Sequence, residues 1–392
     1  MQRRRADQLW AESSLSSVDS ATSPPSSADS AASLSSVDRD HLDRALDLAA
    51  HGPAADPNPR VGAVIVDLAG HVVGEGWHQG AGTDHAEVMA LVAAGERARG
   101  GTAYVTLEPC RHHGRTGPCT QALLGAGIDR VVFAYADPSP DAGSGATELT
   151  AAGVTVHALP PEDPLAGQAA ELVEAWSFAI RHGRPRVVWK TATTLDGRSA
   201  AADGTSQWIT APATRARGHQ LRAECGAILV GTGTALADDP ALTVRLGQDA
   251  TRIGLDGSRP AGSPGPGEAL SYHRPLRVVL GERDLPPNAT LRDDAAPTLL
   301  LRHRDPARAL VDLHTRGVRQ VLLEGGPTLA AAFLRDGLVD RVVLHLAPLL
   351  LGAGRTLGDF GVDTLSGAHR LTIRSVEHLD PDVIVIADVH PS

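Results

Sequence analysis

The sequence predicts two consecutive α/β domains, each built from helices packed on a sheet, behind an unstructured N-terminal tail. Three observations predict this arrangement. The chain has 392 residues, which exceeds the length of one typical domain core. Short β-rich runs alternate with Ala- and Leu-rich helical segments. Aromatic residues make up only 3% of the chain beside 41 glycines, a composition that suits closely packed layers of Ala, Val and Leu.

The tail covers residues 1–37, which are rich in Ser, Ala and Asp and lack an apolar period. Such a segment buries too little apolar surface to fold, so we expect it to be disordered. The run from Arg3 to Arg5 and the many serines are typical of an organelle transit peptide, but Asp7 and Glu12 are not. A misassigned start codon explains the tail equally well.

Charge and cysteine content restrict the partner and the compartment. A formal net charge of −10 and a pI near 5.9 disfavour polynucleotides, so we expect a small-molecule substrate and no nucleic acid. Three cysteines form no disulfide framework, which indicates a reducing compartment, by default the cytoplasm. No apolar run reaches the roughly 18 residues that span a bilayer, so we expect no membrane contact.

The first domain is expected over residues 38–183. It opens with a helix from Asp40, because the following HLDRALDLAA carries apolar residues at helical spacing. Further helices are expected to start near His85, Cys119 and Glu148. The predicted strands are 63–67, 72–77, 103–107, 131–134 and 154–157.

The second domain is expected over residues 184–392. The segment Arg181-His-Gly-Arg-Pro185 follows a helical pattern and precedes a new β-rich run, so it marks the boundary. The Gly- and Pro-rich stretch 254–275 is expected to form a long surface loop. The predicted strands are 187–190, 227–230, 277–280, 298–301, 320–323, 341–346 and 383–387.

Four residues of the first domain have the types and order of a hydrolytic zinc site. His85 and Glu87 open a predicted helix, Cys110 follows a strand and Cys119 opens another helix. One imidazole and two thiolates leave the fourth tetrahedral position of Zn²⁺ for a water, whose pKa falls to about 7. Glu87 lies two residues from His85 and is placed to carry a proton without binding the metal. The pattern H-x-E followed by P-C is the signature of zinc nucleobase deaminases.

Each of these residues has a simpler explanation when taken alone. His85 could be a polar helix N-terminus, and the cysteines could be buried thiols or a structural zinc pair. All four in this order favour catalysis. His112 and His113 in the spacer between the cysteines could be further ligands, but Gly114 and Arg115 beside them favour a substrate-facing loop.

Five short motifs surround this site: Asp56-Pro-Asn-Pro-Arg-Val-Gly62, Gly74-Glu-Gly-Trp-His78, His85-Ala-Glu87, Thr106-Leu-Glu-Pro-Cys110 and His112-His-Gly-Arg-Thr116. With the eight-residue spacer between the cysteines, they resemble the deaminase half of the bifunctional riboflavin-biosynthesis deaminase/reductase family. The resemblance implies a cytidine-deaminase-like three-layer fold. It also implies that this domain hydrolyses the 2-amino group of a diaminopyrimidinone ribosylamino 5′-phosphate. It also implies that Asn58 holds the pyrimidine edge and that His78 lines the same pocket.

The second domain carries weaker signals. The segment Leu323-Glu-Gly-Gly-Pro-Thr-Leu329 joins a strand end to a helix start, which exposes backbone N–H groups to an anion such as a nucleotide phosphate. An ordinary tight turn explains it equally well, and it is not the dinucleotide fingerprint G-x-G-x-x-G. With the segments 194–198, 206–210, 231–234 and 237–245, it resembles the reductase half of the same family. The resemblance implies a dihydrofolate-reductase-like α/β fold that uses NADPH to reduce the ribosyl chain to ribityl.

Residue by residue, this resemblance implies two sets of contacts. The implied substrate contacts are Ser206, Arg222, Leu242, Arg245 and Glu324. The implied cofactor contacts are Ala192, Trp208, Thr234, Asp238, Gly326, Pro327, Thr328, Leu329, Ala330, Ala331 and Ala332. Two arginines suit a ribose 5-phosphate, because their forked donors bind phosphate oxygens bidentately. Without the resemblance, Arg222 is a solvated helix residue, Arg245 an exposed strand end and Trp208 a core residue. No proton donor is assigned.

The chain departs from the family's pattern after the strand 278–280, where Gly281-Glu282 stands in place of an Asp-Ser pair near the cofactor. This departure leaves the preference between NADPH and NADH open. Two alternatives for the whole chain also remain. One is a nucleoside or polynucleotide deaminase with an unrelated second domain, and the other is a degenerate reductase fold that serves dimerisation or ligand sensing. The family resemblance suggests a homodimer or higher homo-oligomer.

Overall fold

The computed structural model describes residues 34–111, 117–140, 144–246 and 274–390. His112, His113, most of the predicted tail and nearly all of the predicted loop 254–275 lie outside the described residues. The first helix, α1 (Ser36–Ala50), begins before the predicted Asp40. Within the described ranges, no helix combines the length and the apolarity that a membrane span requires.

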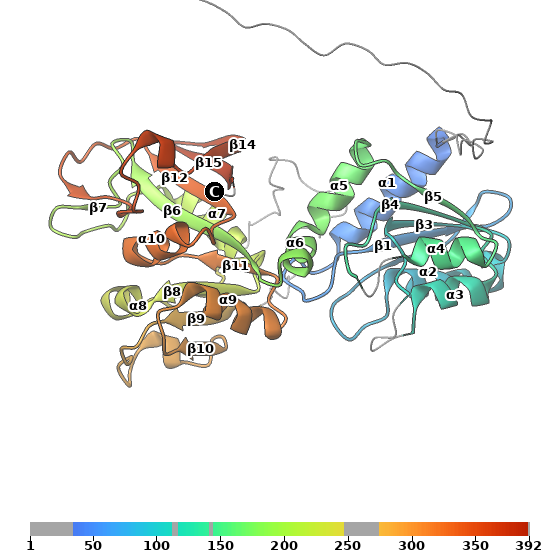
Figure 1. Cartoon of the computed structure of the whole chain (residues 1–392), viewed down its shortest axis with the longest axis horizontal. Coiled ribbons are helices and arrows are strands. Elements are labelled where there is room, and N and C mark those ends of the chain that lie inside the picture. Colours follow the sequence, from blue (N-terminus) through green and yellow to red (C-terminus); the bar gives the residue numbers. More distant parts are fainter. Residues whose placement is uncertain (1–33, 112–116, 141–143, 247–273, 391–392) are drawn as a thin grey trace, which may run out of the picture. The chain divides into compact units, whose positions relative to one another are not determined.

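The first domain is built on a five-stranded sheet in the order β2-β1-β3-β4-β5 (Figure 1). Strand β1 pairs antiparallel with β2 and β3, whereas β3, β4 and β5 run parallel. The strands are β1 (Gly62–Val66), β2 (Val72–Trp77), β3 (Thr102–Leu107), β4 (Arg130–Tyr135) and β5 (Thr155–Ala158). All five predicted strands are present, with ends that agree to within one residue.

Helices cover both faces of this sheet, which confirms the three-layer prediction (Figure 1). Helices α1 and α5 (Pro164–Leu172) pack on one face. The other face is covered by α2 (Ala86–Ala94), α3 (Cys119–Ala126) and α4 (Gly145–Ala151), and a 3-10 turn (Gly95–Ala98) follows α2.

Glycines in the strands let the helices of the first domain approach the sheet backbone directly. A Cβ on Gly62 would lie 2.0 Å from the Ala45 carbonyl oxygen of α1. On the other face, a Cβ on Gly76 would lie 2.4 Å from the Ala86 carbonyl oxygen at the start of α2. Both distances are impossible for a real Cβ, so these positions require glycine. The Gly76 contact fixes the N-terminus of α2, where His85 and Glu87 lie.

The second domain contains an eight-stranded sheet in the order β10-β9-β8-β11-β6-β12-β15-β14. The strands from β10 to β12 run parallel, and β15 and β14 are added antiparallel. They are β6 (Arg186–Thr194), β8 (Ala227–Gly231), β9 (Leu276–Leu280), β10 (Thr298–Leu301), β11 (Gln320–Leu323), β12 (Arg341–Ala347), β14 (Leu371–Leu379) and β15 (Asp382–Val389). A separate two-stranded ribbon joins β7 (Ala200–Ala201) and β13 (Gly354–Arg355).

Two apolar cores lie on opposite faces of this sheet. One contains Leu310 of α9 (Pro306–Thr315) and Phe333 of α10 (Pro327–Arg335). The other contains Leu221 of α7 (Pro212–Ala223), packed against Val343 and Ile384. The remaining elements are α6 (Glu174–His182), α8 (Thr232–Asp238) and two 3-10 turns (Thr290–Arg292, Leu365–Gly367). These layers fit the predicted α/β class.

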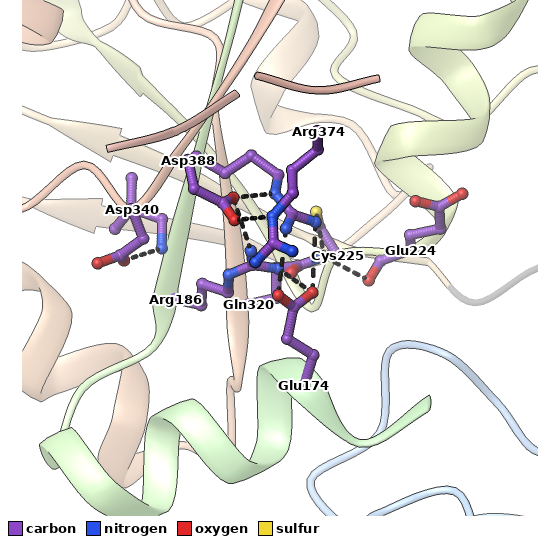
Figure 2. Close-up of polar contacts among 10 residues, drawn as sticks. Glu174, Arg186, Glu224, Cys225, Gln320, Asp340, Arg374 and Asp388 are labelled. Carbon is purple, nitrogen blue, oxygen red and sulfur yellow. Dashed lines mark hydrogen bonds and ion pairs between the residues drawn. The ribbon is translucent and has the colours of Figure 1, made fainter. Parts of the chain in front are cut away.

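A network of ion pairs lies where β6 and β12 begin and β15 ends (Figure 2). Glu174 of α6 accepts hydrogen bonds from Arg186 at 2.6 Å and from Arg341 at 3.1 Å. Asp388 accepts from Arg341 at 2.7 Å and from Arg374 at 2.5 Å. Charged groups therefore stabilise this end of the sheet, and the opposite, carboxyl ends of the parallel strands remain for a ligand, as is usual in α/β sheets.

Candidate active sites

The zinc constellation predicted from the sequence is brought together at the ends of three elements. His85 caps α2, Cys110 follows β3 and Cys119 is the first residue of α3. The ligand atoms of these three residues all lie within 4.8 Å of one another. His85 Nδ1 lies 3.1 Å from Cys119 Sγ and 3.6 Å from Cys110 Sγ.

The 3.6 Å separation is that of a zinc site, and the 3.1 Å separation is shorter than such a site requires, so His85 and Cys119 would move slightly apart around a zinc ion. Zn–N and Zn–S bonds of about 2.1 and 2.3 Å at tetrahedral angles place neighbouring ligand atoms about 3.5–3.8 Å apart. The hydrogen bond from the Cys119 thiol, with a further one from His85, lowers the pKa of the Cys110 thiol well below its ordinary value. Cys110 is thus already favoured as a thiolate before a metal binds. With no other described residue completing the cluster, three protein ligands leave one position for water.

Glu87 lies in the first turn of α2 and is 4% exposed. Burial, reinforced by the neighbouring Cys110 thiolate, raises the pKa of its carboxyl. A carboxyl with a raised pKa exchanges protons more readily near neutral pH than an ordinary glutamate does. The position and the electrostatics of Glu87 therefore suit a proton shuttle beside the metal cluster.

Asn58 and His78 lie next to this cluster and contact each other. The Asn58 side-chain nitrogen is 3.2 Å from His78 Nε2, and the His78 ring lies edge-on to His85 with centroids 6.0 Å apart. His78 Nδ1 faces the Asp84 carbonyl oxygen at 3.4 Å. If Nδ1 donates to that oxygen, Nε2 is the acceptor and Asn58 donates to it. The Asn58 carbonyl oxygen is then left to accept a hydrogen bond from a pyrimidine N–H group.

Asp56 was not among the predicted site residues, although it orders the same loop. Its Oδ1 accepts from the Asn58 backbone N–H at 2.9 Å, and its Oδ2 accepts from the Ala81 N–H at 2.9 Å. The signal in the sequence was an Asp-Pro-Asn-Pro turn, in which an aspartate commonly caps the N–H group two residues later.

In the second domain, Arg222 and Glu324 form a bidentate pair. Arg222 Nε and Nη2 donate to the two carboxylate oxygens at 2.7 and 2.6 Å, and Nη1 donates to the Thr243 carbonyl at 2.9 Å. Burial opposes ionisation of Glu324, but Arg222 keeps the pKa of its carboxyl below the usual value. All three guanidinium nitrogens of Arg222 are engaged, so the fork formed by Nε and Nη2 is not open to a phosphate while the pair persists.

The loop after α8 brings two further predicted substrate contacts to this pair. Leu242 is buried with a φ of +47°, which turns the chain so that the Thr243 carbonyl meets Arg222. The Arg245 backbone N–H donates to His219 Nδ1 at 3.2 Å, and its guanidinium is exposed. Among the described residues no ion pair engages that guanidinium.

The predicted cofactor contacts fall into two groups. Gly326 caps α10, and its N–H donates to Thr234 Oγ1 of α8 at 3.0 Å, so these two helix termini meet. Pro327 and Thr328 are exposed beside them, whereas Ala330 and Ala331 are buried in the core. Elsewhere, Trp208 is 67% exposed, contrary to the expectation that taken alone it would be a core residue, and the Arg215 guanidinium lies 4.5 Å from its ring centroid. Of the remaining predicted cofactor contacts, Asp238 is exposed and Ala192 is half-buried on β6. Ser206, a predicted substrate contact, is exposed as well.

Lys190 is the residue of this site that the sequence reasoning missed. It lies on β6, and burial lowers the pKa of its ammonium. The negative charge of Glu324 opposes this shift, and the positive charge of Arg222 adds to it. No described residue forms a hydrogen bond or an ion pair with it. The available signal was a lysine inside the otherwise apolar strand Val187–Lys190, because charged residues are rarely placed in buried strands without a reason.

The departure at Gly281-Glu282 has a structural explanation. A Cβ on Gly281 would lie 2.5 Å from Thr232 Oγ1, and the residue has a φ of +142°, so only glycine fits. Glu282 is exposed and pairs with Arg304 at 3.2 Å. Cys225, expected to be a core thiol, is 1% exposed and accepts from Gln320 Nε2 at 3.5 Å.

Both halves of the chain match known families. Residues 35–135 match the cytidine and deoxycytidylate deaminase zinc-binding region, and residues 185–385 match the RibD C-terminal domain. The riboflavin biosynthesis protein RibD of Mycobacterium tuberculosis is 48% identical over 331 residues, which cover 84% of this chain and 90% of that protein. RibD of Escherichia coli is 39% identical over 374 residues, which cover 88% of this chain and 98% of that protein.

Solved structures give the same result. Acinetobacter baumannii RibD superposes with a TM-score of 0.77 and 34% identity, covering 90% of this chain and 99% of that one. The diaminohydroxyphosphoribosylaminopyrimidine deaminase/5-amino-6-(5-phosphoribosylamino)uracil reductase of Thermotoga maritima superposes with a TM-score of 0.76 and 30% identity, with the same coverage.

Proposed function

The chain belongs to the RibD family of bifunctional riboflavin-biosynthesis enzymes, and we propose on that premise how its own residues perform a zinc-dependent deamination and an NADPH-dependent reduction. Membership over both halves removes the alternative of an unrelated second domain. The division at residues 183 and 184 fits the structure, in which α6 ends at His182 and β6 begins at Arg186. The first domain, residues 38–183, is the deaminase, and residues 184–392 are the reductase.

The deaminase acts on a diaminopyrimidinone ribosylamino 5′-phosphate and releases ammonia from C2. The observation that carries this assignment is the cluster of His85, Cys110 and Cys119 with the buried Glu87 beside it. Bound zinc supplies the Lewis acid that lowers the pKa of a coordinated water. Glu87 accepts the proton of the attacking water and returns it to the departing amine, so the water oxygen ends on C2 as a carbonyl.

The pyrimidine is held by the pair of Asn58 and His78. His78 fixes the Asn58 amide so that its carbonyl oxygen accepts from the ring, as the 3.2 Å contact between them supports. Asp56 orders the loop that carries Asn58 through two backbone N–H groups. These residues orient C2 of the substrate toward the metal cluster and Glu87.

In the reductase, the residues bind and orient while NADPH supplies the hydride. Arg245 is the arginine that meets the ribose 5-phosphate, because its guanidinium is exposed, whereas Arg222 is committed to Glu324. Ser206 and Leu242 complete the substrate side. Lys190 offers a donor to a substrate oxygen next to Glu324.

The cofactor lies along the face that carries Ala192, Trp208, Thr234 and Asp238. The start of α10, from Gly326 to Ala332, meets a phosphate of NADPH with the positive end of the helix and with the Thr328 N–H, because Pro327 has no N–H and those of Gly326, Leu329 and Ala330 are already bonded. Thr234 holds that helix terminus in place through the 3.0 Å hydrogen bond with Gly326. The reduction adds one hydride at the ribosyl C1′ and one proton, which opens the sugar to a ribityl phosphate chain.

The deaminase assignment is tested with Glu87→Gln in the full chain. The variant should retain zinc and lose ammonia release by about 100-fold or more, because only the proton carrier has gone. NADPH oxidation should be unchanged when the variant receives the deaminated substrate. Near-normal ammonia release by this variant would contradict the role of Glu87 as the proton carrier.

The reductase assignment has its own test. Wild-type protein given the diaminopyrimidine phosphate should oxidise NADPH only after ammonia appears, and with the deaminated intermediate it should oxidise NADPH at once. A protein that deaminates but never consumes NADPH from that intermediate would instead be a deaminase with a non-catalytic second domain.

The compartment and the assembly are also proposed. Cys110, Cys119 and Cys225 are all free thiols, which supports a reducing compartment such as the cytoplasm. A homodimer is the expected assembly, and sedimentation or light scattering of the purified chain at two concentrations checks it. A single monomer mass at both concentrations would contradict the dimer.

A further inference from the structure

His345 of β12 is a buried imidazole without a hydrogen-bond partner. It is 0% exposed, and within the described part of the chain neither Nδ1 nor Nε2 has a hydrogen-bond partner. An imidazole buried in this way normally satisfies both nitrogens, because leaving a buried polar atom unpaired costs about 1–3 kcal/mol. Such a side chain in an otherwise apolar strand therefore indicates a task that apolar packing does not explain.

The register of the sheet places His345 beside the reductase site. His345 pairs with Ala192 of β6, one of the proposed cofactor contacts, and Val343 pairs with Lys190. Directly paired residues share a face, and residues two apart on a strand share it as well. His345, Ala192 and Lys190 therefore point to the same side of the sheet, the side covered by α7.

A glycine of α7 brings the two side chains together. An ideal Cβ on Gly218 would lie 3.8 Å from His345 Cε1 and 3.9 Å from Lys190 Cε. The Cε1 atom is bonded to both ring nitrogens, and Lys190 Cε carries the ammonium. The His345 ring and the end of the Lys190 side chain therefore both lie against α7 at Gly218, although in the structure the ammonium is not within hydrogen-bond distance of either ring nitrogen.

The charges around His345 determine its protonation state. Burial, followed by the positive charges of Lys190 and Arg217, lowers the pKa of the imidazole to about 3. Arg217 of α7 in turn forms ion pairs with Glu377 at 3.7 Å and with Glu224 at 3.6 Å. From β15 the directly paired residue is the apolar Ile384, and from β6 it is Ala192. A neutral imidazole has one lone pair to offer, and Lys190 is the adjacent donor that no described residue engages.

We propose that His345 is a positioning residue of the reductase: a rotation of the Lys190 side chain brings its ammonium to the neutral imidazole, which accepts a hydrogen bond from it and fixes where that cation points beside Glu324. The inference rests on the proposed reductase role of this face of the sheet. It assigns a function to a residue that touches neither substrate nor cofactor. Lys190 meets the substrate, and His345 acts through Lys190.

The proposal predicts a change in pH dependence as well as in rate. The ammonium is the charged form of Lys190, so an acceptor beside it raises the pKa and removal of the acceptor lowers it further. In His345→Phe, the alkaline limb of the reductase kcat/KM profile for the deaminated pyrimidine should move to lower pH. At the wild-type optimum, kcat/KM should fall by about tenfold.

Three controls separate this role from simple packing. His345→Gln keeps an acceptor and should restore most of the rate and the wild-type position of the alkaline limb. Val343→Ala removes buried volume two residues away on the same face and should leave the profile where it is. Ammonia release by the deaminase half of the same chains reports whether each variant has folded.

A profile for His345→Phe that superposes on that of the wild type overturns the inference, and so does an equal shift in Val343→Ala. Wild-type protein without NADPH consumption overturns the proposed function instead. ¹⁵N NMR of the imidazole in the wild type and in Lys190→Met gives a second test, which does not depend on the folding of a His345 variant. The unprotonated ring nitrogen should shift when Lys190 is removed, and an unchanged spectrum also overturns the inference.

Discussion

The two active sites of this chain are built in different ways. The deaminase cluster comes from one short stretch, His85 to Cys119, and each residue sits at the end of an element that glycine-mediated packing fixes in place. The reductase site gathers Lys190, Arg222 and Glu324 with His345, from strands and a helix far apart in the sequence. The first site depends on residue types with few other uses. The second depends on common charged residues that also stabilise the fold.

This difference leads to distinct responses to substitution. Removing a deaminase residue should stop one reaction and leave the other intact. Removing a reductase residue should weaken both the reaction and the stability of the sheet, by graded amounts.

The largest expected effect is the loss of a zinc ligand. Cys119→Ser replaces a thiolate with a poor zinc ligand, so zinc content and ammonia release should both fall to background, a loss of about 1,000-fold or more. NADPH oxidation with the deaminated substrate should stay within twofold of wild type. The matched control is Cys225→Ser, which alters a buried thiol away from the cluster and should retain zinc. Full zinc occupancy in Cys119→Ser would contradict the assignment of Cys119 as a zinc ligand.

The second prediction concerns the Arg222–Glu324 pair. Each side chain is 15% exposed, and Glu324→Gln leaves a largely buried guanidinium without its counter-charge. Breaking a buried pair costs about 3–5 kcal/mol, so this partly exposed one should cost about 2–3 kcal/mol of unfolding free energy. Reductase kcat/KM should fall by about 100-fold as well. Chemical denaturation and steady-state kinetics measure the two effects.

The control for this variant is Glu282→Gln. Its partner Arg304 is 75% exposed and Glu282 is 60% exposed, so the loss should stay below about 1 kcal/mol. Equal losses in the two variants would show that the Arg222–Glu324 pair adds nothing beyond a surface contact.

The same contrast explains what the sequence could predict. All five strands of the first sheet follow from short apolar runs, and the zinc cluster follows from His, Glu and Cys in a fixed order. In the second domain, β14 was missed because its sequence LTIRSVEHL is exposed over most of its length and lacks a clear alternation. Lys190 was missed because its importance appears only where β6 and β11 lie side by side.

Arg222 shows a further limit of sequence reasoning. The resemblance implies substrate contact, and a fork of donors suits phosphate, yet in the structure the fork is filled by Glu324 and a backbone carbonyl. Which of two chemically equivalent arginines is free depends on tertiary contacts that no local pattern records.

A smaller effect is expected where packing supports the zinc site. A Cβ on Gly145, the first residue of α4, would lie 1.8 Å from the carbonyl oxygen of Pro109, which precedes Cys110. Gly145→Ala should therefore displace Cys110 and cost about 1–3 kcal/mol, as overpacking does. Zinc affinity should fall by about tenfold. Gly167→Ala in α5 meets no atom within 4 Å and should be neutral or slightly stabilising. Unchanged zinc affinity in Gly145→Ala would show that Pro109 can move away from the added methyl group without displacing Cys110.

The last predicted effect concerns acid stability, and it too distinguishes the two halves. The pKa of His345 is lowered to about 3 by burial, so between that value and the ordinary 6.5 the unfolded chain binds a proton that the folded chain does not. Stability from this residue is complete above pH 6.5 and is lost as the pH falls, by about 2 kcal/mol between pH 7 and pH 5. In His345→Phe, the unfolding free energy of the reductase half should depend less on pH over this range by that amount. Val343→Ala should lower the free energy at both pH values equally. A His345→Phe protein with the wild-type pH dependence would mean that the buried imidazole can be protonated without unfolding, and that water or an unrecognised carboxylate reaches it.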